Sequence, residues 1–440
     1  MRSYVPNTVA ERKEMLKTIG LNSMDELFGD IPEELKLARP LDLPAPLSEM
    51  ELRDLIIGYA LQDDSNGLLF RGAGVYNHYI PALIPQLLSR SEFYTAYTPY
   101  QAEMSQGMLQ SIFEWQTVIC NLTGMEASNA SVYDGATAAA ESLIMLANIK
   151  RKQKVLYSAA LNPGVIRTMK TYAHCRNIEL VEIPVNKDGI TDMDALCAAL
   201  PESAGYIAAQ PNYFGCIENM DAISEIVHAN KALLVSYCNP ISLGVIKRPG
   251  DYGADIAIGD TQPMGIPMNF GGPYAGFMAT TNKNIRNLPG RIVGETVDGE
   301  GNRVYVLTLQ AREQHIRRDK ASSNICSNEM LEAIASTIYA CTMGPDGIKE
   351  VGEQNIAKAH YLANELCKLP GIRMRYNSPF FNEFVIDTDT DAQKLNDELK
   401  ECGIIGGLVL EDGGMLWCAT EMVSKEDMDF VVDRLKEVLQ

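Results

Sequence analysis

The chain has 440 residues, and its 57 acidic side chains against 38 Lys and Arg give a formal net charge of −19. This length allows two to three domains, and 46% hydrophobic residues are ordinary for a soluble globular protein. Net negative charge argues against nucleic acid or an anionic membrane as a partner, because both are themselves negative. No apolar run approaches the ~18 residues of a membrane span, and the N-terminus lacks a signal-peptide core. We therefore expect a cytoplasmic protein.

The ten cysteines and five histidines are scattered, and no C-x-x-C pair occurs. Structural zinc sites and disulfide scaffolds usually show closely spaced pairs. We expect no metal site, and thiols that stay reduced.

Residues 1–70 are predicted to form a helical N-terminal arm. "TVAERKEMLKTIG" has apolar residues near helical spacing, and Ser23–Glu26 and Ser48–Glu51 both fit a capping box. The proline-rich "ARPLDLPAPL" between them favours an extended link. Since such an arm has few ways to bury its own apolar side chains, we expect it to lie on another surface, such as that of a partner subunit.

Residues 71–345 are predicted to form a large α/β domain. Amphipathic helices are expected over 103–124 and 134–152. Short, unalternating apolar runs then alternate with helical stretches, at "KVLYSA", "IELVEIPV", "AGYIAAQP", "ALLVSYC" and "ADIAIG". This pattern predicts a mainly parallel sheet covered by helices on both faces.

Residues 346–440 are predicted to form a smaller C-terminal α/β domain. "NEFVIDT" and "GMLWCATEMV" read as strands, and "DAQKLNDELKECG" and "SKEDMDFVVDRLKEVL" as helices. The boundary is expected near Gly344 to Gly352.

The segment "ASNASVYDGATAAAE", with Asn129 and Asp134, opens a helix with small residues. The backbone N–H groups of such a helix start can hold a phosphate or a carboxylate. A tight turn leading into a helix packed closely on the sheet explains the same residues, and the spacing alone favours that second interpretation.

Polar and aromatic side chains gather in "FYTAYTPYQAE", which carries Tyr94, Tyr97, Tyr100 and Gln101. Because each tyrosine hydroxyl needs a partner when buried, these residues suit an active-site wall or a subunit interface. An ordinary packed loop is an equally good interpretation.

The basic segment "RRDKASSNIC" places Arg317 and Arg318 near Ser323. These groups could hold an anion. A solvated charge run is the commoner outcome for such a sequence.

Four segments occur together in one order: "YTPYQAEMSQGMLQSIFEWQT", "SNASVYDGATAAAES", "NFGGPYAGFMAT" and "RRDKASSNICSN". In these motifs the chain resembles the glycine cleavage P-protein family over nearly its whole length, and most closely subunit 1 of the two-chain form. The resemblance implies the aspartate-aminotransferase-like fold, fold type I, of pyridoxal phosphate enzymes. It also implies an assembly of two such chains with two of subunit 2.

In the catalytic half of that family, a His-Lys pair precedes the Gly-rich bend, and its lysine forms the imine with pyridoxal phosphate. Here the matching pair is Gln262-Pro263, and the aspartate that would hold the pyridine nitrogen is replaced at about Ser236-Tyr237. Proline has no primary amine, and serine supplies no carboxylate. Lys247, Lys283 and Lys320 are possible substitutes, although most lysines are simply solvated.

The resemblance implies a complex that decarboxylates glycine on pyridoxal phosphate and passes the aminomethyl group to the lipoyl arm of the H-protein. We expect no catalytic lysine in this chain and no covalently bound cofactor, with the imine formed on the partner subunit. This chain would support or complete the partner's site, chiefly through Tyr94, Tyr97, Tyr100 and Gln101. The alternatives are a purely structural or regulatory subunit and a self-sufficient pyridoxal phosphate enzyme, which the missing lysine disfavours.

Overall fold

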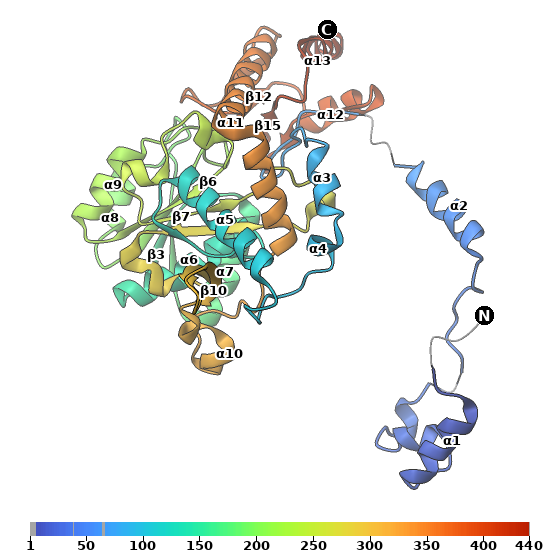
Figure 1. Ribbon diagram of the computed structural model, residues 1–440. Helices are drawn as coiled ribbons and strands as arrows, with labels where there is room; N and C mark the ends of the chain where they lie inside the picture. The colour runs from blue at the N-terminus through green and yellow to red at the C-terminus, as the bar shows by residue number, and fades with distance from the viewer. Residues whose placement is uncertain (1–5, 38, 64–66, 440) are drawn as a thin grey trace. The chain divides into compact units, whose positions relative to one another are not determined.

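The computed structural model describes residues 6–37, 39–63 and 67–439, which form two compact units, Met1–Ser65 and Asn66–Gln440 (Figure 1). Residues 1–5, 38, 64–66 and 440 lie outside the described residues; they include the first residue of the predicted proline-rich link.

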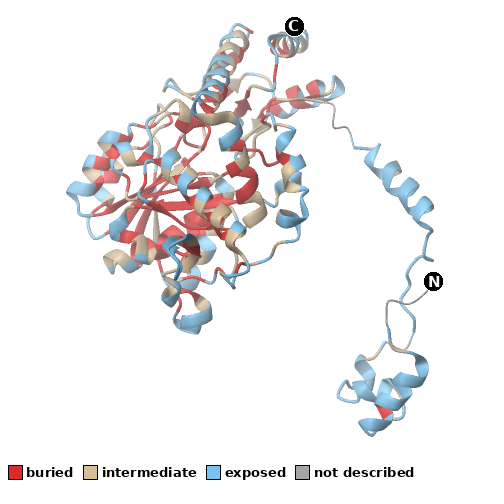
Figure 2. Cartoon of the chain, in the orientation of Figure 1, coloured by how far each residue is buried: buried red, intermediate tan, exposed pale blue. Residues whose placement is uncertain are grey.

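The N-terminal unit holds two α-helices, α1 (Val9–Thr18) and α2 (Glu49–Ala60), and two 3-10 turns, η1 (Asp25–Phe28) and η2 (Glu33–Leu35). The capping box predicted at Ser48 is present, whereas Ser23 does not cap a helix, because η1 begins after Met24 without a side-chain cap. Among its described residues only Leu16 is buried, and apolar side chains such as Leu35 and Leu61 are exposed (Figure 2). The unit therefore has almost no core of its own.

The larger unit is built on a seven-stranded sheet in the order β2-β8-β7-β6-β5-β3-β4. Its strands are β2 (Ala127–Ser128), β3 (Lys154–Ser158), β4 (Glu179–Ile183), β5 (Gly205–Gln210), β6 (Leu233–Cys238), β7 (Ile256–Asp260) and β8 (Gly276–Thr280). Strands β3 to β7 are parallel to one another, and β8 runs antiparallel to both β7 and β2. The predicted mainly parallel sheet is confirmed.

Helices cover both faces of this sheet (Figures 1 and 2). One face packs against α5 (Gln106–Thr123), α8 (Met193–Ala199), α9 (Met220–Ala229) and the first half of α11 (Met330–Leu366). The other packs against α6 (Gly135–Lys150) and α7 (Pro163–Arg176). Successive strand residues alternate between the two cores, as Leu156 and Tyr157 do, so both faces of each strand are apolar. This is why the strands read as unalternating runs.

A two-stranded hairpin that the sequence did not predict follows the sheet: β9 (Ile292–Val297) and β10 (Arg303–Thr308) are antiparallel. After it come the short turns η7 (Gln310–Arg312), α10 (Gln314–Arg317) and η8 (Arg318–Lys320), which hold the basic segment. Before α5 lie α3 (Leu83–Leu88) and α4 (Ser91–Tyr94).

The C-terminal part contains a four-stranded antiparallel sheet in the order β11-β12-β15-β14. Its elements are β11 (Ile372–Met374), β12 (Glu383–Thr388), β14 (Leu408–Val409), β15 (Met415–Cys418), α12 (Ala392–Glu401) and α13 (Lys425–Val438). The predicted boundary near Gly344 falls inside α11, at a kink where Gly344 has a φ of 63° and Pro345 follows. One chain segment preceding the large sheet also joins this part, because β1 (Leu68–Leu69) pairs with β13 (Ile404–Ile405).

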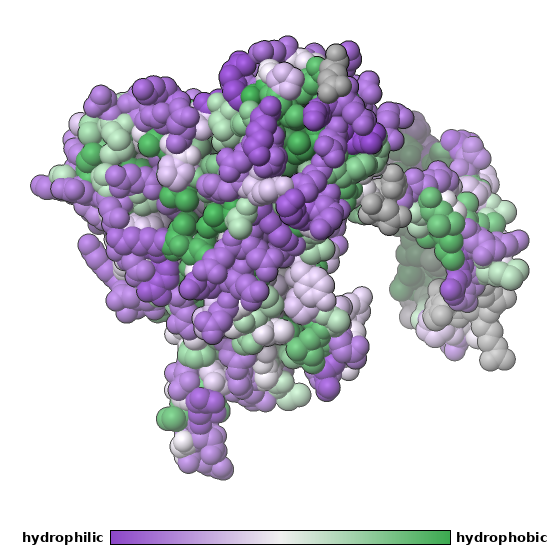
Figure 3. Space-filling view, turned by 90° about the horizontal axis from the view of Figure 1, so that it is seen from above, coloured by the Kyte–Doolittle hydropathy of each residue, from purple (hydrophilic) through white to green (hydrophobic). Residues whose placement is uncertain are grey.

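Most of the face seen in Figure 3 is hydrophilic, with hydrophobic residues in separate patches. None of the helices in the described part of the chain is long and apolar enough to cross a membrane.

Candidate functional site

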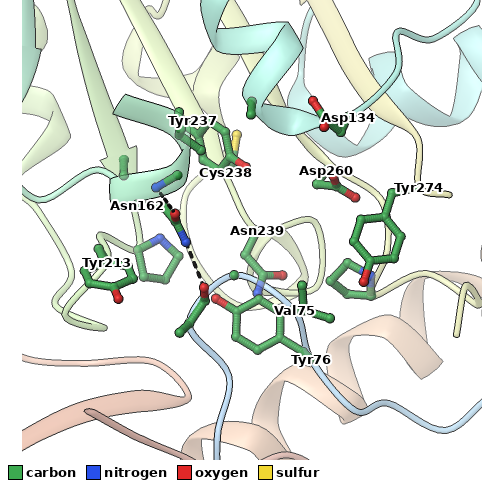
Figure 4. Close-up of a pocket in the computed structure, with 18 of the residues that line it drawn as sticks. Val75, Tyr76, Asp134, Asn162, Tyr213, Tyr237, Cys238, Asn239, Asp260 and Tyr274 are labelled. Atoms are coloured by element: carbon green, nitrogen blue, oxygen red, sulfur yellow. Dashed lines mark hydrogen bonds between the residues drawn. The ribbon is translucent and has the colours of Figure 1, made fainter. Parts of the chain in front are cut away.

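A cavity of about 550 Å³ opens at the carboxyl ends of the central parallel strands (Figure 4). Residues at the ends of β6 and β7, namely Tyr237, Cys238 and Asp260, line it together with the starts of α6 and α7. In open α/β sheets this edge is where ligands bind, because the strand ends and the helix N-termini converge there. We take this cavity as the candidate site.

The start of α6 is hydrogen-bonded to carboxylates of the chain itself. Asp134 caps the helix by accepting from the Thr137 N–H at 2.6 Å, and Asp260 accepts from the Gly135 N–H at 3.0 Å. Two N–H groups that could hold a phosphate are therefore already bonded to negative groups. This arrangement favours the closely packed turn over the anion-binding interpretation of "SVYDGATAAAE".

Asp260 also accepts from the Gln262 N–H, at 2.8 Å. Burial, together with a smaller effect of the nearby charge of Asp134, raises the pKa of Asp260 to about 7, against the lowering effect of its two backbone hydrogen bonds. The two carboxylates lie at the same end of the cavity, beside Tyr274 (Figure 4). This end of the cavity is therefore acidic.

Tyr237 fills the space above the first turn of α6. A Cβ at Gly135 would lie 2.3 Å from the Tyr237 hydroxyl oxygen, so only glycine fits there. Ser236, its neighbour, is fully buried and bonds the Tyr252 hydroxyl at 2.7 Å. Of the two residues placed near the missing aspartate, Tyr237 is thus the one that faces the cavity.

Gln262 and Pro263 have different positions at the cavity. Pro263 lines the cavity, whereas Gln262 is buried and binds the backbone of Tyr76 twice, accepting from its N–H and donating to its C=O, each at 2.9 Å. The Gln262 amide also donates to the Ile266 C=O at 2.9 Å. Gln262 therefore fixes one wall of the cavity.

Glu383, which the sequence did not indicate, hydrogen-bonds two residues of the same wall. Its carboxylate accepts from the Ala73 N–H at 2.6 Å and from the Tyr76 hydroxyl at 2.8 Å. Burial raises the pKa of Glu383 to about 7, against the effect of these two hydrogen bonds. Asn162 and Arg167 also line the cavity, and the Asn162 amide donates to the Ala73 C=O at 2.7 Å.

The predicted tyrosine wall lies elsewhere. Tyr94 and Tyr97 line a separate hollow of about 160 Å³, and Tyr94, Tyr97, Tyr100 and Gln101 are exposed. The Tyr100 hydroxyl accepts from Nη2 of Arg291 at 3.2 Å. Only Asp134, of the predicted site residues, lines the large cavity.

The remaining predicted residues are structural or exposed in this chain. Asn129 is fully buried; its amide donates to the Pro289 C=O at 3.0 Å and accepts from the Ser131 N–H. Arg317 and Arg318 are exposed, and Ser323 is buried beside the carboxylate of Glu141.

The three lysines named above as possible substitutes for an imine lysine do not line the cavity. Lys247 pairs with Asp221 at 2.5 Å, and Lys283 and Lys320 are exposed. Among the described residues, no lysine lines the cavity, and Arg167 is its one basic side chain.

Sheet order, helix layers and the position of the cavity define fold type I of the pyridoxal phosphate enzymes. A NifS-like protein (TM-score 0.63, 12% identity, covering 85% of this chain and 99% of that one) and a sphingosine-1-phosphate lyase of Burkholderia pseudomallei (0.61, 13%, covering 92% and 93%) share the fold. The family model described as "Glycine cleavage system P-protein" matches residues 2–435, and the chain belongs to this family.

Individual members of the family match this chain along its full length. The chain is 48% identical to a protein of Desulfitobacterium hafniense named "Probable glycine dehydrogenase (decarboxylating) subunit 1", with 99% of this chain and 100% of the relative covered. A protein of Moorella thermoacetica with the same name is 47% identical, with the same coverage. A crystal structure of a glycine decarboxylase (P-protein) in inhibitor-bound form superposes with a TM-score of 0.91, at 40% identity and full coverage of both chains.

The cavity residues do not fit a lysine-bound pyridoxal phosphate. No amine lines the cavity in the described part of the chain, and two carboxylates with Tyr237 occupy the start of α6, where a phosphate would need free N–H groups. The carboxylate of Asp134 there would repel a phosphate dianion.

Proposed function

We propose that this chain is subunit 1 of a glycine dehydrogenase (decarboxylating) of the glycine cleavage system, and that it works with a second subunit of the same fold. The observation that carries the proposal is a cavity kept at the cofactor position of the fold while its helix start is hydrogen-bonded to Asp134 and Asp260. The names of the full-length relatives, which include "subunit 1", support it.

The reaction removes CO2 from glycine, and bound pyridoxal phosphate supplies the electron sink for it. We assign that cofactor and its imine lysine to subunit 2, because Pro263 offers no amine here. The H-protein, whose lipoyl arm receives the aminomethyl group, is the expected further partner. Two copies of each subunit are the expected assembly.

This chain would contribute a surface to the partner's site. Tyr94, Tyr97 and Tyr100 are 70%, 78% and 57% exposed, which is unusual for three tyrosines in seven residues unless another chain covers them. Their exposure favours an interface or active-site wall over the packed loop. Gln101, Arg317 and Arg318 are exposed as well, and remain candidates for the same surface.

The test is reconstitution from separately purified subunits. The lone chain should be colourless above 400 nm and inactive in glycine–bicarbonate exchange, and mixing with subunit 2 should restore exchange. A yellow and active lone chain would overturn the assignment.

A second comparison separates an active contribution from a purely structural one. Tyr97→Phe and Tyr100→Phe should lower exchange by the assembled complex at unchanged assembly, with Tyr79→Phe, another exposed tyrosine, as control. If all three variants match the wild-type complex, the chain is the structural or regulatory subunit of the alternative hypothesis.

A further inference from the structure

Two arginines, Arg291 beside Tyr100 and Arg312, have buried donors without acceptors among the described residues. Arg291 is only 3% exposed, and its Nε and Nη1 atoms have no hydrogen-bond partner among the described residues. Arg312 likewise has Nε and Nη2 buried and without a partner in the part of the chain that the structure describes. Leaving such donors unsatisfied costs about 1–3 kcal/mol each, so a group is expected to meet them.

The two guanidinium groups belong to one neighbourhood. Nη1 of Arg312 donates to the C=O of Leu288, three residues before Arg291. The loop between them is fixed, because Asn129 holds the Pro289 C=O and the Ala130 N–H donates to the Arg291 C=O at 2.8 Å. Both arginines act electrostatically on the same carboxylate, Glu313.

That carboxylate does not satisfy them. Glu313 lies within 4.0 Å of neither guanidinium among the described ion pairs, and its own Oε1 is buried without a partner in the described chain. Nδ1 of His315 lies 3.7 Å from the Glu313 carboxylate. Two guanidinium charges and one carboxylate leave an excess of positive charge in a buried place.

We propose that Arg291 and Arg312 form a binding site for a small oxyanion, of the phosphate or carboxylate class, covered by Tyr100. An oxyanion offers several acceptors to the fixed forks of two guanidinium groups and offsets the excess charge. A cation would be repelled, and a neutral ligand would leave the charge uncompensated.

Tyr100 forms the cover of this site. Its hydroxyl accepts from Nη2 of Arg291 at 3.2 Å, and the guanidinium carbon lies 5.2 Å from its ring centre. Its side chain is otherwise 57% exposed, so it can swing outward without breaking a packed core. The ion would then enter from the surface that carries the tyrosines.

The test uses the lone full-length chain, so its result does not depend on the proposed function. Inorganic phosphate is titrated by calorimetry, and the thermal unfolding midpoint is followed against chloride at matched ionic strength, with acetate as the carboxylate arm. We expect saturable binding of at least one of the two anions, with a rise in the midpoint.

Arg291→Met should weaken that binding by about tenfold or more and abolish the rise, since it removes one fork. Its midpoint without oxyanion should match or exceed that of the wild type, because unsatisfied donors are removed. Arg312→Met, at a less buried position, gives the same readout if the first variant does not fold. Arg303→Met is the matched control, since Arg303 is exposed on β10.

No saturable binding of either anion by the wild-type chain would overturn the proposal. Equal binding by the wild type and both buried-arginine variants would do so as well.

Discussion

The raised pKa of Asp260 makes the stability of the folded chain depend on pH. Because burial raises its pKa from 3.8 to about 7, the folded chain keeps a proton that the unfolded chain has lost between those values. Stability therefore falls as pH rises from about 4 to about 7, and is constant above.

Asp260→Asn should remove this dependence. The variant loses one backbone hydrogen bond, so it starts at a disadvantage, but relative to the wild type it should gain about 2–3 kcal/mol between pH 5 and pH 8. Urea unfolding at the two pH values measures the difference, with the exposed Asp194→Asn as control. A difference that does not change with pH would contradict a raised pKa for Asp260.

Pro263→Lys tests whether the missing amine is the only obstacle. The new amine would stand beside the carboxylates of Asp134 and Asp260 and a helix start already hydrogen-bonded to them. We expect no absorbance above 400 nm when this variant is mixed with pyridoxal phosphate at neutral pH. Stoichiometric imine absorbance that resists dialysis would show that the helix start still accepts a phosphate.

At the scale of elements, Gln262 joins the bend after β7 to the segment 73–76. Gln262→Ala removes two part-buried hydrogen bonds to the Tyr76 backbone and one buried bond to the Ile266 C=O, and should cost about 2–4 kcal/mol of unfolding free energy. Gln310→Ala, which removes one exposed bond, should cost almost nothing. Urea unfolding compares the two, and hydrogen exchange should rise at residues 73–76 in the first variant only.

Helices and strands could be predicted from the sequence where a local pattern determines them. The sites could not, because they form where segments distant in the sequence meet. The apolar runs of β3 to β7 and the Asp-Gly start of α6 can be recognised within five to twenty residues of sequence. By contrast Glu383 bonds Ala73 in the cavity wall from 310 residues further along the chain, and no spacing in the sequence indicates such a contact. Arg291 could not be predicted as a site residue, because an isolated arginine in a sequence gives no sign that it is buried. Arg317 and Arg318 were predicted instead, because they belong to a run of charged residues, but they are exposed.

At the scale of the whole molecule, the two units differ in how they can be stable. The unit from residue 66 onward contains all the large cores, whereas the N-terminal unit buries only Leu16 among its described residues. An arm with so little core is expected to gain its order from another surface.

Deleting residues 1–65 should therefore leave the thermal midpoint of the lone chain within about 2 °C of the full-length value, since few stabilising contacts are lost. Co-purification with subunit 2 should weaken, because we expect the arm to lie on a partner. An unchanged affinity for subunit 2 would contradict that role for the arm, and a collapsed midpoint would show that the arm stabilises its own chain.

The hydrogen-bonded start of α6 also bears on how this chain can change over generations. Restoring an amine at Pro263 would bring no benefit while Asp134, Asp260 and Tyr237 remain, and replacing any one of these alone disturbs a cap, a buried carboxylate or the contact with Gly135. Each first step toward an independent enzyme is thus neutral or harmful. Under the proposed division of labour between the two subunits, the loss of the cofactor site in this chain would therefore be hard to reverse one substitution at a time.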